Sequence, residues 1–351
     1  MAIKMPFRSK SKIRRVMAEA DALVRAGKFK EAISLLQISN RKFGSPEIEI
    51  LLVKLRHEAF YHGEFLTQLE QWPPEVSNLF AETIGIPEVD SMQFHAETLR
   101  SGVFTKGSII VRNLLNQEDV ELLRRGIEKT YLHCDLALAG SSIDVTKPWY
   151  VPFQPINYDA DSLLPREWYR SGGAQLAADS PRGLFNLLEC FEKTGIIDVI
   201  TDYLGERPAL SVRKTSLRQI PPNLNTENGW HQDGAFLGAG IRTVNLWIAL
   251  TDCGVDAPSM DMVPRRLSSI IPTGTDGAVF NWSISNQMLD EVCSESPFSH
   301  LHFKAGDAIV FDEMNLHRTS TLPAMTMPRY AIEAWFFAPS CYPMDQLPLI
   351  V

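Results

Sequence analysis

Apolar residues recur at helical spacing along the first third of the chain. Apolar positions three or four residues apart predict an amphipathic helix that ends at Gly27 and a second one that ends at Gly44. Ser45 and Pro46 have the character of an N-cap and a first-turn proline, so they predict that a third helix begins there. We therefore expect a helical arm over residues 1–65.

Within this arm, the run ALVRAGKFKEAISLL resembles a tetratricopeptide-type helix pair. We find one such unit in the sequence, whereas a solenoid needs about three repeats to bury its core. We therefore interpret the arm as a helical hairpin that docks on a larger domain. A second interpretation, in which the arm forms a homodimer contact or binds a protein partner, stays open.

From about residue 207 the helical spacing gives way to short strands separated by turn residues. The predicted strands lie in the segments ALSVRKTSLRQI, RTVNLWIALTD, SHLHF, DAIVFDE and RYAIEAWFF. Several short strands at this spacing predict an antiparallel sandwich or jelly roll. Because helices come first and strands later, we expect an α+β fold. Its core would be a double-stranded β-helix (jelly roll, cupin-like) that helices buttress.

The segments between the arm and these strands divide into a connector and the start of the larger domain. Residues 66–105 have little regular period and predict a connector, and residues 107–115 predict a buried strand. The amphipathic run QEDVELLRRGIEKTYL predicts the next helix, so the jelly-roll domain would cover residues 106–351. Residues 140–180 are rich in turn formers, and we expect a long loop there that acts as a lid.

The composition is that of a globular protein, and it limits the classes of function. A net charge of −8 argues against a broad nucleic-acid surface, which needs a basic stripe. No run of about 18 apolar residues predicts a membrane span, and the basic start lacks the apolar core of a signal peptide. The five cysteines are scattered, which fits a reducing compartment. We expect a cytoplasmic protein.

Candidate chemistry is concentrated in the segment GWHQDGAF, residues 229–236. Residues two apart in a strand project to the same side, so His231 and Asp233 can reach one point. Such a pair is weak on its own, because a surface histidine beside an acidic turn residue is common. His317 adds a third donor, and a jelly roll can bring this distant strand end to the first pair. Two histidines and one carboxylate form the facial triad that suits Fe(II).

Arg329 follows His317 by twelve residues, at the start of another predicted strand. If 2-oxoglutarate bound iron through its 1-carboxylate and 2-keto oxygen, its 5-carboxylate would need a cation, and a guanidinium meets a carboxylate in bidentate fashion. A surface arginine after a loop proline is the ordinary alternative. Glu333 lies four residues further on and could point inward on the same strand face. It would then need a partner, either a cationic substrate group or an arginine.

Together these blocks resemble the phytanoyl-CoA dioxygenase family of Fe(II)/2-oxoglutarate oxygenases. The resemblance covers about residues 105–340 and rests on GSIIVRNLLNQEDVELLRRGIE, WHQDGAF, VNLWIALTD, GDAIVFDEMNLHRTS and MPRYAIEAWFF. The order and spacing of the blocks are more specific than any single motif. Two departures stand out: APSMDMVPRRL replaces the usual turn, and the interval from His317 to Arg329 is slightly long.

Carried over by position, the resemblance implies a set of iron ligands and co-substrate contacts. The iron ligands would be His231, Asp233 and His317. The co-substrate contacts would be Arg329, Thr319, Asn245, Trp247 and Gln219, with Arg218 as the alternative to the last. The implied cofactors are Fe(II), 2-oxoglutarate and O₂. Because Asp233 is present, the halide-binding variant of this chemistry is disfavoured.

The implied reaction is the hydroxylation of a small polar or anionic metabolite, with release of succinate and CO₂. An anionic substrate is favoured by four arginines at expected loop or strand-end positions, which are otherwise surface residues: Arg170, Arg242, Arg265 and Arg266. Two other classes remain as alternatives. One is a catalytically silent jelly roll whose arm recruits a partner, and the other is a cupin-like zinc or manganese enzyme. We interpret a rival metal pair, His300 and His302, as solvent-facing strand residues.

Overall fold

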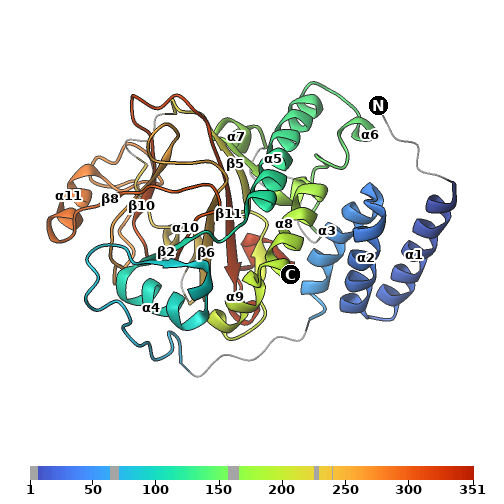
Figure 1. The fold of residues 1–351 in the computed structure, drawn as a ribbon, viewed down its shortest axis with the longest axis horizontal. Coiled ribbons are helices and arrows are strands. Elements are labelled where there is room, and N and C mark those ends of the chain that lie inside the picture. The colour runs from blue at the N-terminus through green and yellow to red at the C-terminus, as the bar shows by residue number, and fades with distance from the viewer. Residues whose placement is uncertain (1–6, 64–70, 157–165, 225–228, 239) are drawn as a thin grey trace.

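The computed structural model describes residues 7–63, 71–156, 166–224, 229–238 and 240–351. A large sheet lies at the centre of the molecule, and helices cover one of its faces (Figure 1). A smaller sheet packs against its other face, and three N-terminal helices lie at one end (Figure 1). Within these described ranges, no helix is both long and apolar enough to cross a membrane.

The elements have the following bounds in chain order. The α-helices are α1 Phe7–Arg25, α2 Phe29–Phe43, α3 Pro46–Phe60, α4 Ala96–Lys106, α5 Gln117–Leu138, α6 Ile143–Thr146, α7 Arg166–Ser171, α8 Pro181–Lys193, α9 Ile196–Leu204, α10 Gly234–Leu237 and α11 Asn286–Glu295. The strands are β1 Glu88–Asp90, β2 Ser108–Arg112, β3 Ala174–Leu176, β4 Ala209–Ser211, β5 Ser216–Ile220, β6 Thr243–Ala249, β7 Ser259–Met262, β8 Ser299–His300, β9 Ala308–Phe311, β10 His317–Ser320, β11 Arg329–Phe337 and β12 Pro348–Ile350.

Two sheets form the jelly roll. The larger sheet runs β1-β2-β9-β6-β11-β4-β12, with β5 pairing both β11 and β3. The smaller sheet runs β10-β7-β8. Apart from the parallel pair β1 and β2, the ladders are antiparallel. The predicted α+β fold with a jelly-roll core is confirmed, because helices cover the outer face of the large sheet and the small sheet covers its inner face.

Side chains of the two central strands alternate between the two faces of the large sheet. On β6, Val244, Leu246 and Ile248 pack under the helices, whereas Trp247 faces the smaller sheet. On β11, Ile332 and Ala334 belong to the helical side. This period of two follows from the pleat of a strand. It leaves the odd-numbered positions of both strands free to line the interior between the sheets.

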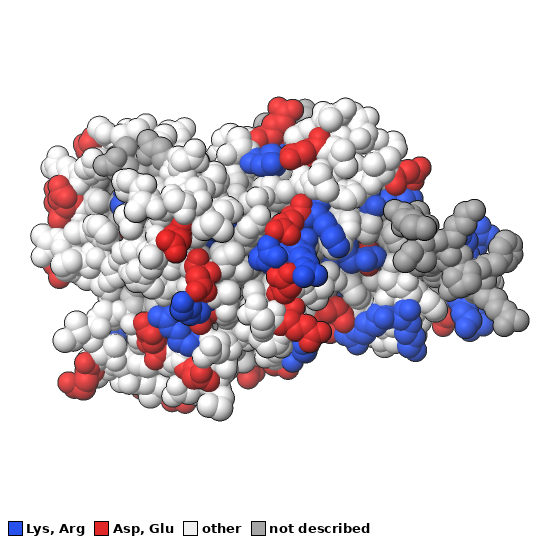
Figure 2. Space-filling model, turned by 45° about the horizontal axis from the view of Figure 1, so that its top comes forward, with Lys and Arg blue, Asp and Glu red and all other residues white. Residues whose placement is uncertain are grey.

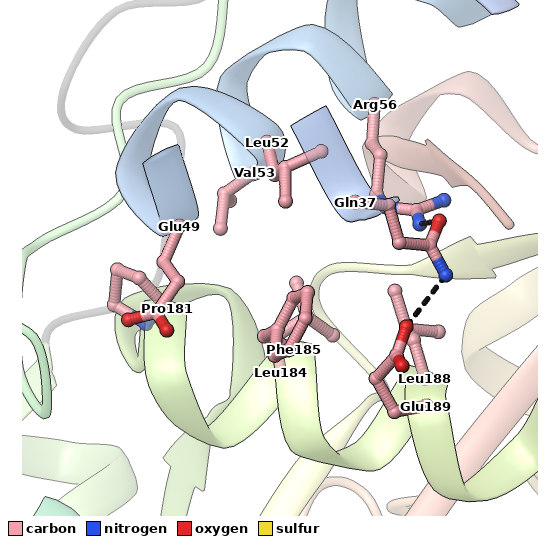
Figure 3. A pocket seen from close by; sticks show the side chains of 10 residues that line it. All are labelled: Gln37, Glu49, Leu52, Val53, Arg56, Pro181, Leu184, Phe185, Leu188 and Glu189. Atoms are coloured by element: carbon pink, nitrogen blue, oxygen red, sulfur yellow. Dashed lines mark hydrogen bonds between the residues drawn. The ribbon is translucent and has the colours of Figure 1, made fainter. Parts of the chain in front are cut away.

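The N-terminal arm consists of α1, α2 and α3, and it rests on α8 (Figure 3). Gln37 of α2 donates from Nε2 to Glu189 Oε1 of α8 at 2.7 Å. Arg56 of α3 is buried and donates from Nη2 to Gln37 Oε1 at 2.9 Å. Arg182 of α8 pairs with the buried Glu49 of α3. Polar contacts as well as apolar packing therefore join the arm to the larger domain.

The C-terminal strand β12 is an edge strand of the large sheet and lies beside the arm. It pairs with β4 on one side. On the other side, Arg56 donates from Nη1 to Ile350 O at 3.0 Å, and His57 contacts Pro348 O through Nδ1 at 2.7 Å. A buried carbonyl needs such a donor. The two ends of the described chain are thus tied together through α3.

Two expectations about the middle of the chain are wrong in part. The structure contains α6, α7 and β3 within residues 140–180, where we expected one long loop. β3 forms because it adds to the edge strand β5, and a buried Asp179 that pairs with Arg166 holds the neighbouring turn. Residues 157–165 lie outside the described residues. The segment ALSVRKTSLRQI forms two strands, β4 and β5, separated by a turn.

Acidic and basic side chains alternate over the middle of the face in Figure 2, without a field of one sign. Surface ion pairs of the chain include those of Arg124 with Glu121 and Glu128 on α5. Surface pairs of this kind contribute little to stability and keep the surface hydrated. This face offers no broad basic stripe of the kind that nucleic-acid binding requires.

The contacts of Arg56 predict that the arm contributes to the stability of the whole domain. Arg56→Ala removes two hydrogen bonds and leaves Gln37 Oε1 and Ile350 O without this donor. We expect the free energy of unfolding to fall by about 2 kcal/mol, because unpaired buried acceptors are costly. Chemical denaturation measures the change, and Lys54→Ala, at an exposed position on the same helix, is the control. Equal stability of the two variants would contradict the prediction.

Candidate metal centre

One short backbone pairing brings the two predicted histidines together. His231 N donates to His317 O at 3.0 Å, and His317 N donates to His231 O at 3.1 Å. This reciprocal pair is an isolated antiparallel bridge. Side chains of directly opposed residues lie on the same side of the ladder. The two imidazole rings accordingly lie with their centroids 4.6 Å apart, although 85 residues lie between the two histidines in the sequence.

Asp233 completes the group from the same segment as His231. Its Oδ2 lies 3.5 Å from His317 Nε2. One donor atom of each of the three residues lies within 4.8 Å of the other two. Within the described ranges, no other group of three or more histidine, cysteine or acidic residues brings its donor atoms together in this way. The structure therefore places the three predicted ligands at one point.

Hydrogen bonds to carbonyl oxygens orient both imidazoles. His231 Nδ1 lies 2.8 Å from Gly229 O, and His317 Nδ1 lies 3.2 Å from Asn315 O. A carbonyl only accepts, so Nδ1 carries the proton and Nε2 presents its lone pair. Such second-shell bonds fix the tautomer of a metal-binding histidine. The arrangement suits a metal that is bound through both Nε2 atoms.

The local sequence around this pair explains why the strand end is held in place. Gln232 points to the opposite side from His231 and Asp233, where Nε2 donates to Met314 O at 2.8 Å and Oε1 accepts from Ile271 N at 2.8 Å. At Gly234 a Cβ atom would lie 2.4 Å from Ile270 Cδ1. Only glycine allows this close approach. Both residues lock the loop that carries Asp233 against its neighbours.

A cavity of about 600 Å³ opens beside the three donors. A volume in this range is typical of small-molecule sites. Arg329, the predicted co-substrate ligand, lines the same cavity as His231, Asp233 and His317. Glu333, four residues along β11, also lines it, so the expectation that the two side chains share an inward strand face is confirmed.

Arg329 is a buried cation whose hydrogen-bond donors do not all have partners. It is 1% exposed and donates from Nη1 to Ser259 O at 2.6 Å. Its Nη2 lies 3.4 Å from Thr319 Oγ1, and its guanidinium lies over the Trp247 ring. Among the described residues, no carboxylate forms a salt bridge with it, and its Nε has no hydrogen-bond partner. Burial lowers the pKa of Arg329 to about 10. A buried cation of this kind requires an anion.

The other predicted co-substrate contacts divide into two groups. Thr319, Asn245 and Trp247 line the cavity, and the two residues of β6 share one strand face as expected. Gln219 is absent from the cavity wall, and its Nε2 donates to Tyr330 Oη at 3.1 Å. Its neighbour Arg218 lines the cavity instead and lies 3.4 Å from Glu333. Assigning Gln219 to the site was wrong, because alternation along β5 turns it to the opposite face.

The four arginines that favoured an anionic substrate lie elsewhere, and none of them lines the cavity. Each pairs with a carboxylate outside it: Arg170 with Asp135, Arg242 with Glu206, Arg265 with Glu295, and Arg266 with Asp312. Arg242 directly precedes β6, at an expected strand end, but it is buried. Their charges are already compensated within the fold. The preference for an anionic substrate therefore loses its support.

Of the histidine pair His300 and His302, only His300 lies on β8, and it differs from expectation. His300 is partly buried, and its ring nitrogens contact Asp261 Oδ1 at 2.8 Å and Gly254 O at 2.9 Å. His302 is exposed, as predicted. The two rings are perpendicular with centroids 5.2 Å apart. His300 therefore holds the smaller sheet together and is not a solvent-facing residue.

Several cavity residues carried no recognisable signal in the sequence. Aromatic side chains from three separate segments stand around the opening: Trp168, Tyr169, Phe236, Phe280 and Trp282. Phe280 and Trp282 stack with centroids 5.0 Å apart, and the Trp282 ring meets the edge of His231. Lys214 reaches Asp233, with Nζ 2.6 Å from Oδ1. Lys214, Phe280 and Trp282 lie in turns or loops, and the other three lie in the short helices α7 and α10. Neither period nor motif marks the residues that point inward in such segments.

A jelly roll that presents two histidines and one carboxylate beside a cavity is typical of non-haem iron enzymes. The comparison with protein families gives the more specific class. Residues 104–322 match the phytanoyl-CoA dioxygenase family. The chain belongs to this family, whose cofactors are iron and 2-oxoglutarate. The comparison with curated proteins found no match.

Solved structures with a similar fold include three bacterial proteins. EctD from S. alaskensis, solved with 2-oxoglutarate and 5-hydroxyectoine, is 16% identical, with 79% of this chain and 88% of that chain covered and a TM-score of 0.48. AviO1 from Streptomyces viridochromogenes Tue57 is 17% identical, with 72% and 98% covered and a TM-score of 0.45. EvdO2 from Micromonospora carbonacea var. aurantiaca, complexed with 2-oxoglutarate, is 15% identical, with 70% and 89% covered and a TM-score of 0.43.

The surroundings of the histidines predict a metal affinity that changes little with pH. Burial and the neighbouring His317 lower the pKa of His231 to about 4, and burial also lowers the pKa of His317. Because the lowered pKa favours the neutral ring, protons compete with the metal at His231 only as the pH falls toward about 4. An ordinary histidine would begin to protonate near pH 6.5.

Titration with Co(II), a redox-stable probe, at pH 7.5, 6.5 and 5.5 tests this prediction. We expect the dissociation constant to change by less than about tenfold over this range. Two exposed ordinary histidines would instead weaken binding by about a hundredfold between pH 7.5 and 5.5. A loss of that size would contradict the prediction.

Proposed function

We propose that this protein is an Fe(II)/2-oxoglutarate-dependent dioxygenase that hydroxylates a small polar metabolite and releases succinate and CO₂. In this proposal His231, Asp233 and His317 bind the iron. Arg329 and Thr319 bind the 5-carboxylate of 2-oxoglutarate, and Asn245 and Trp247 form the adjoining wall. The observation that carries the proposal is the buried Arg329, whose guanidinium lines the same cavity as the three converging donors.

The residues present fit both cofactors. Two imidazole nitrogens and one carboxylate leave open positions on Fe(II), which a chelating 2-oxoacid and O₂ can share. The incompletely satisfied guanidinium of Arg329 suits the remote carboxylate, and the neighbouring Thr319 hydroxyl adds a donor. Asn245 Oδ1 is buried without a hydrogen-bond partner among the described residues. It offers one more polar contact on the same wall.

When bound, the iron and 2-oxoglutarate supply the oxidising chemistry, because no amino-acid side chain can activate O₂ for this reaction. The residues of this chain bind, orient and shield. Burial of Asp233 would raise its pKa, but the Lys214 ammonium and the two imidazoles hold the pKa below the usual range. The carboxylate therefore stays ionised as a ligand. The aromatic side chains at the opening restrict access of bulk water.

The cavity wall supports a polar substrate with an apolar or ring-shaped face. The aromatic residues Phe236 and Phe280 remain about one-third exposed at the opening, and Trp168 is 60% exposed. The charged side chains nearby are arranged in opposite-sign pairs, such as Arg218 with Glu333. Such a wall favours stacking and hydrogen bonding over the recognition of a strong anion.

The alternative of a silent scaffold has little support in the arrangement of the arm. The faces of α2 and α3 that could recruit a partner are in part occupied by α8, through the contacts of Gln37 and Glu49. We propose that the arm is a docked helical extension of the oxygenase domain. A contact between the remaining surface of the arm and a second protein is compatible with this proposal.

Single substitutions should distinguish a residue that binds 2-oxoglutarate from a residue that binds iron. Arg329→Ala should weaken 2-oxoglutarate binding by about 10–100-fold and leave the iron bound, because a charge-assisted hydrogen bond contributes roughly 1.5–3 kcal/mol. Asp233→Ala should lose the iron itself. Anaerobic titration of the Fe(II) protein with 2-oxoglutarate measures the first effect through the visible charge-transfer band. Metal analysis after desalting measures the second.

Arg242→Lys is a useful comparison, because it changes a buried arginine that does not line the cavity. We expect its 2-oxoglutarate affinity to equal that of the wild type. If Arg329→Ala kept wild-type affinity, the assignment of this arginine would be wrong even with an intact iron site. Wild-type protein that bound zinc and ignored 2-oxoglutarate would support the cupin-like alternative.

Thr319→Ala should have a smaller effect than Arg329→Ala. The threonine contributes one neutral hydroxyl, so we expect 2-oxoglutarate affinity to fall about fivefold, in line with about 1 kcal/mol for a neutral hydrogen bond. Thr319→Ser should retain the affinity. The same anaerobic titration measures both variants. A serine variant as weak as the alanine variant would show that the hydroxyl does not contact the co-substrate.

A further inference from the structure

Lys214 lies in the turn between β4 and β5, beside the metal centre. The turn is fixed by its backbone: Lys214 N donates to Ser211 Oγ at 2.9 Å, and Val212 N donates to Leu347 O at 2.9 Å. About three-quarters of the side chain is buried. Its Nζ lies over the Phe236 ring, 5.1 Å from the centroid. Both the backbone and the side chain of this lysine are therefore held in place.

The two oxygens of Asp233 face different partners. Oδ1 accepts a hydrogen bond from Lys214 Nζ at 2.6 Å. Oδ2 lies on the side of the histidines, 3.5 Å from His317 Nε2. A carboxylate that uses both oxygens as ligands would occupy two metal positions, and one that uses a single oxygen leaves three positions open in a facial triad. The hydrogen-bond donor on Oδ1 therefore affects how many coordination positions of the metal stay open.

We propose that Lys214 is a positioning residue for the iron ligand Asp233. Its ammonium holds Oδ1, so that Asp233 presents only Oδ2 to the metal, and it places a fixed positive charge beside the iron. This inference rests on the proposed iron site at His231, Asp233 and His317. Among the described residues, no lysine or arginine other than Lys214 forms a salt bridge with one of these three ligands.

A lysine in this place has a cost that argues for a specific role. A cation beside a metal ion repels it, and a neutral donor such as a glutamine could hold Oδ1 without this repulsion. The lysine also draws electron density from the carboxylate that binds the metal. Both effects make it harder to remove an electron from Fe(II). Lys214 would therefore stabilise the ferrous state.

The charge-transfer band of the anaerobic Fe(II)–2-oxoglutarate complex reports this effect directly. The transition moves an electron from the metal to the 2-oxoacid, so a nearby positive charge raises its energy. We expect Lys214→Met to move the band to longer wavelength and Lys214→Arg to leave it at the wild-type position. We also expect the Fe(II) form of Lys214→Met to oxidise faster in air without substrate.

Lys214→Gln separates the hydrogen bond from the charge. It can still donate to Oδ1, so we expect it to bind iron as the wild type does but to show the shifted band. If Lys214→Met binds iron 10–100-fold more weakly while Lys214→Gln does not, the hydrogen bond positions the ligand, because loss of a second-shell partner typically has an effect of this size. A shifted band in Lys214→Gln and weaker iron binding in Lys214→Met alone would each support the proposal.

Arg213→Met is the matched control, because Arg213 precedes Lys214, lines the same cavity and lies 4.0 Å from Asp345. We expect its band to stay at the wild-type position. Identical bands and air-oxidation rates in the wild type, Lys214→Met and Lys214→Gln would overturn the proposal. So would an equal shift in Arg213→Met. A wild-type protein that gives no band at all would instead refute the proposed function, which keeps the two failures distinct.

Discussion

The reciprocal backbone hydrogen bonds between His231 and His317 are the constraint on which the site depends. They join two segments that are distant in the sequence and set the spacing of the two imidazoles. The antiparallel pairing also decides that both side chains emerge on the same side. Asp233 follows from the same segment, and Gly234 permits the tight packing behind it. The main contribution of the jelly roll to the site is this one antiparallel bridge between His231 and His317.

Most of the described cations of the cavity wall beside that bridge have a carboxylate partner, and Arg329 is the exception. Arg329 is buried at one end of the cavity without a carboxylate partner among the described residues, which suits an anionic co-substrate. Of the other cations on the wall, Lys214 and Arg218 face Asp233 and Glu333, and Arg213 lies 4.0 Å from Asp345. Because buried charges are stable only when paired, the pattern separates the place for the co-substrate from the rest of the cavity. The outer part is left to aromatic side chains.

The three helices of the arm and α8 support the site without lining the cavity. α8 lies between the arm and the large sheet, so the contacts of Gln37 and Arg56 extend one packed unit from α2 to the C-terminal strand β12. β12 pairs with β4, and the turn after β4 carries Lys214. The arm thereby supports the edge of the sheet from which one wall of the cavity is built. A docked extension fits this role better than a free recruiting module.

The sequence by itself determined the α+β fold, the helical arm and the candidate ligands, because periodicity and the order of the motifs are local properties. Alternation along a strand also put Asn245 and Trp247 on one common face, and the family resemblance implied that this face and Arg329 line the co-substrate site. The sequence misplaced Gln219 and the arginines beyond the cavity, and it carried no sign of Lys214 or of the aromatic residues of the cavity. Lys214 lies in a turn, and the aromatic residues lie in turns or in the short helices α7 and α10. Only the tertiary structure decides which of their side chains face the metal, because that depends on packing between segments far apart in the chain.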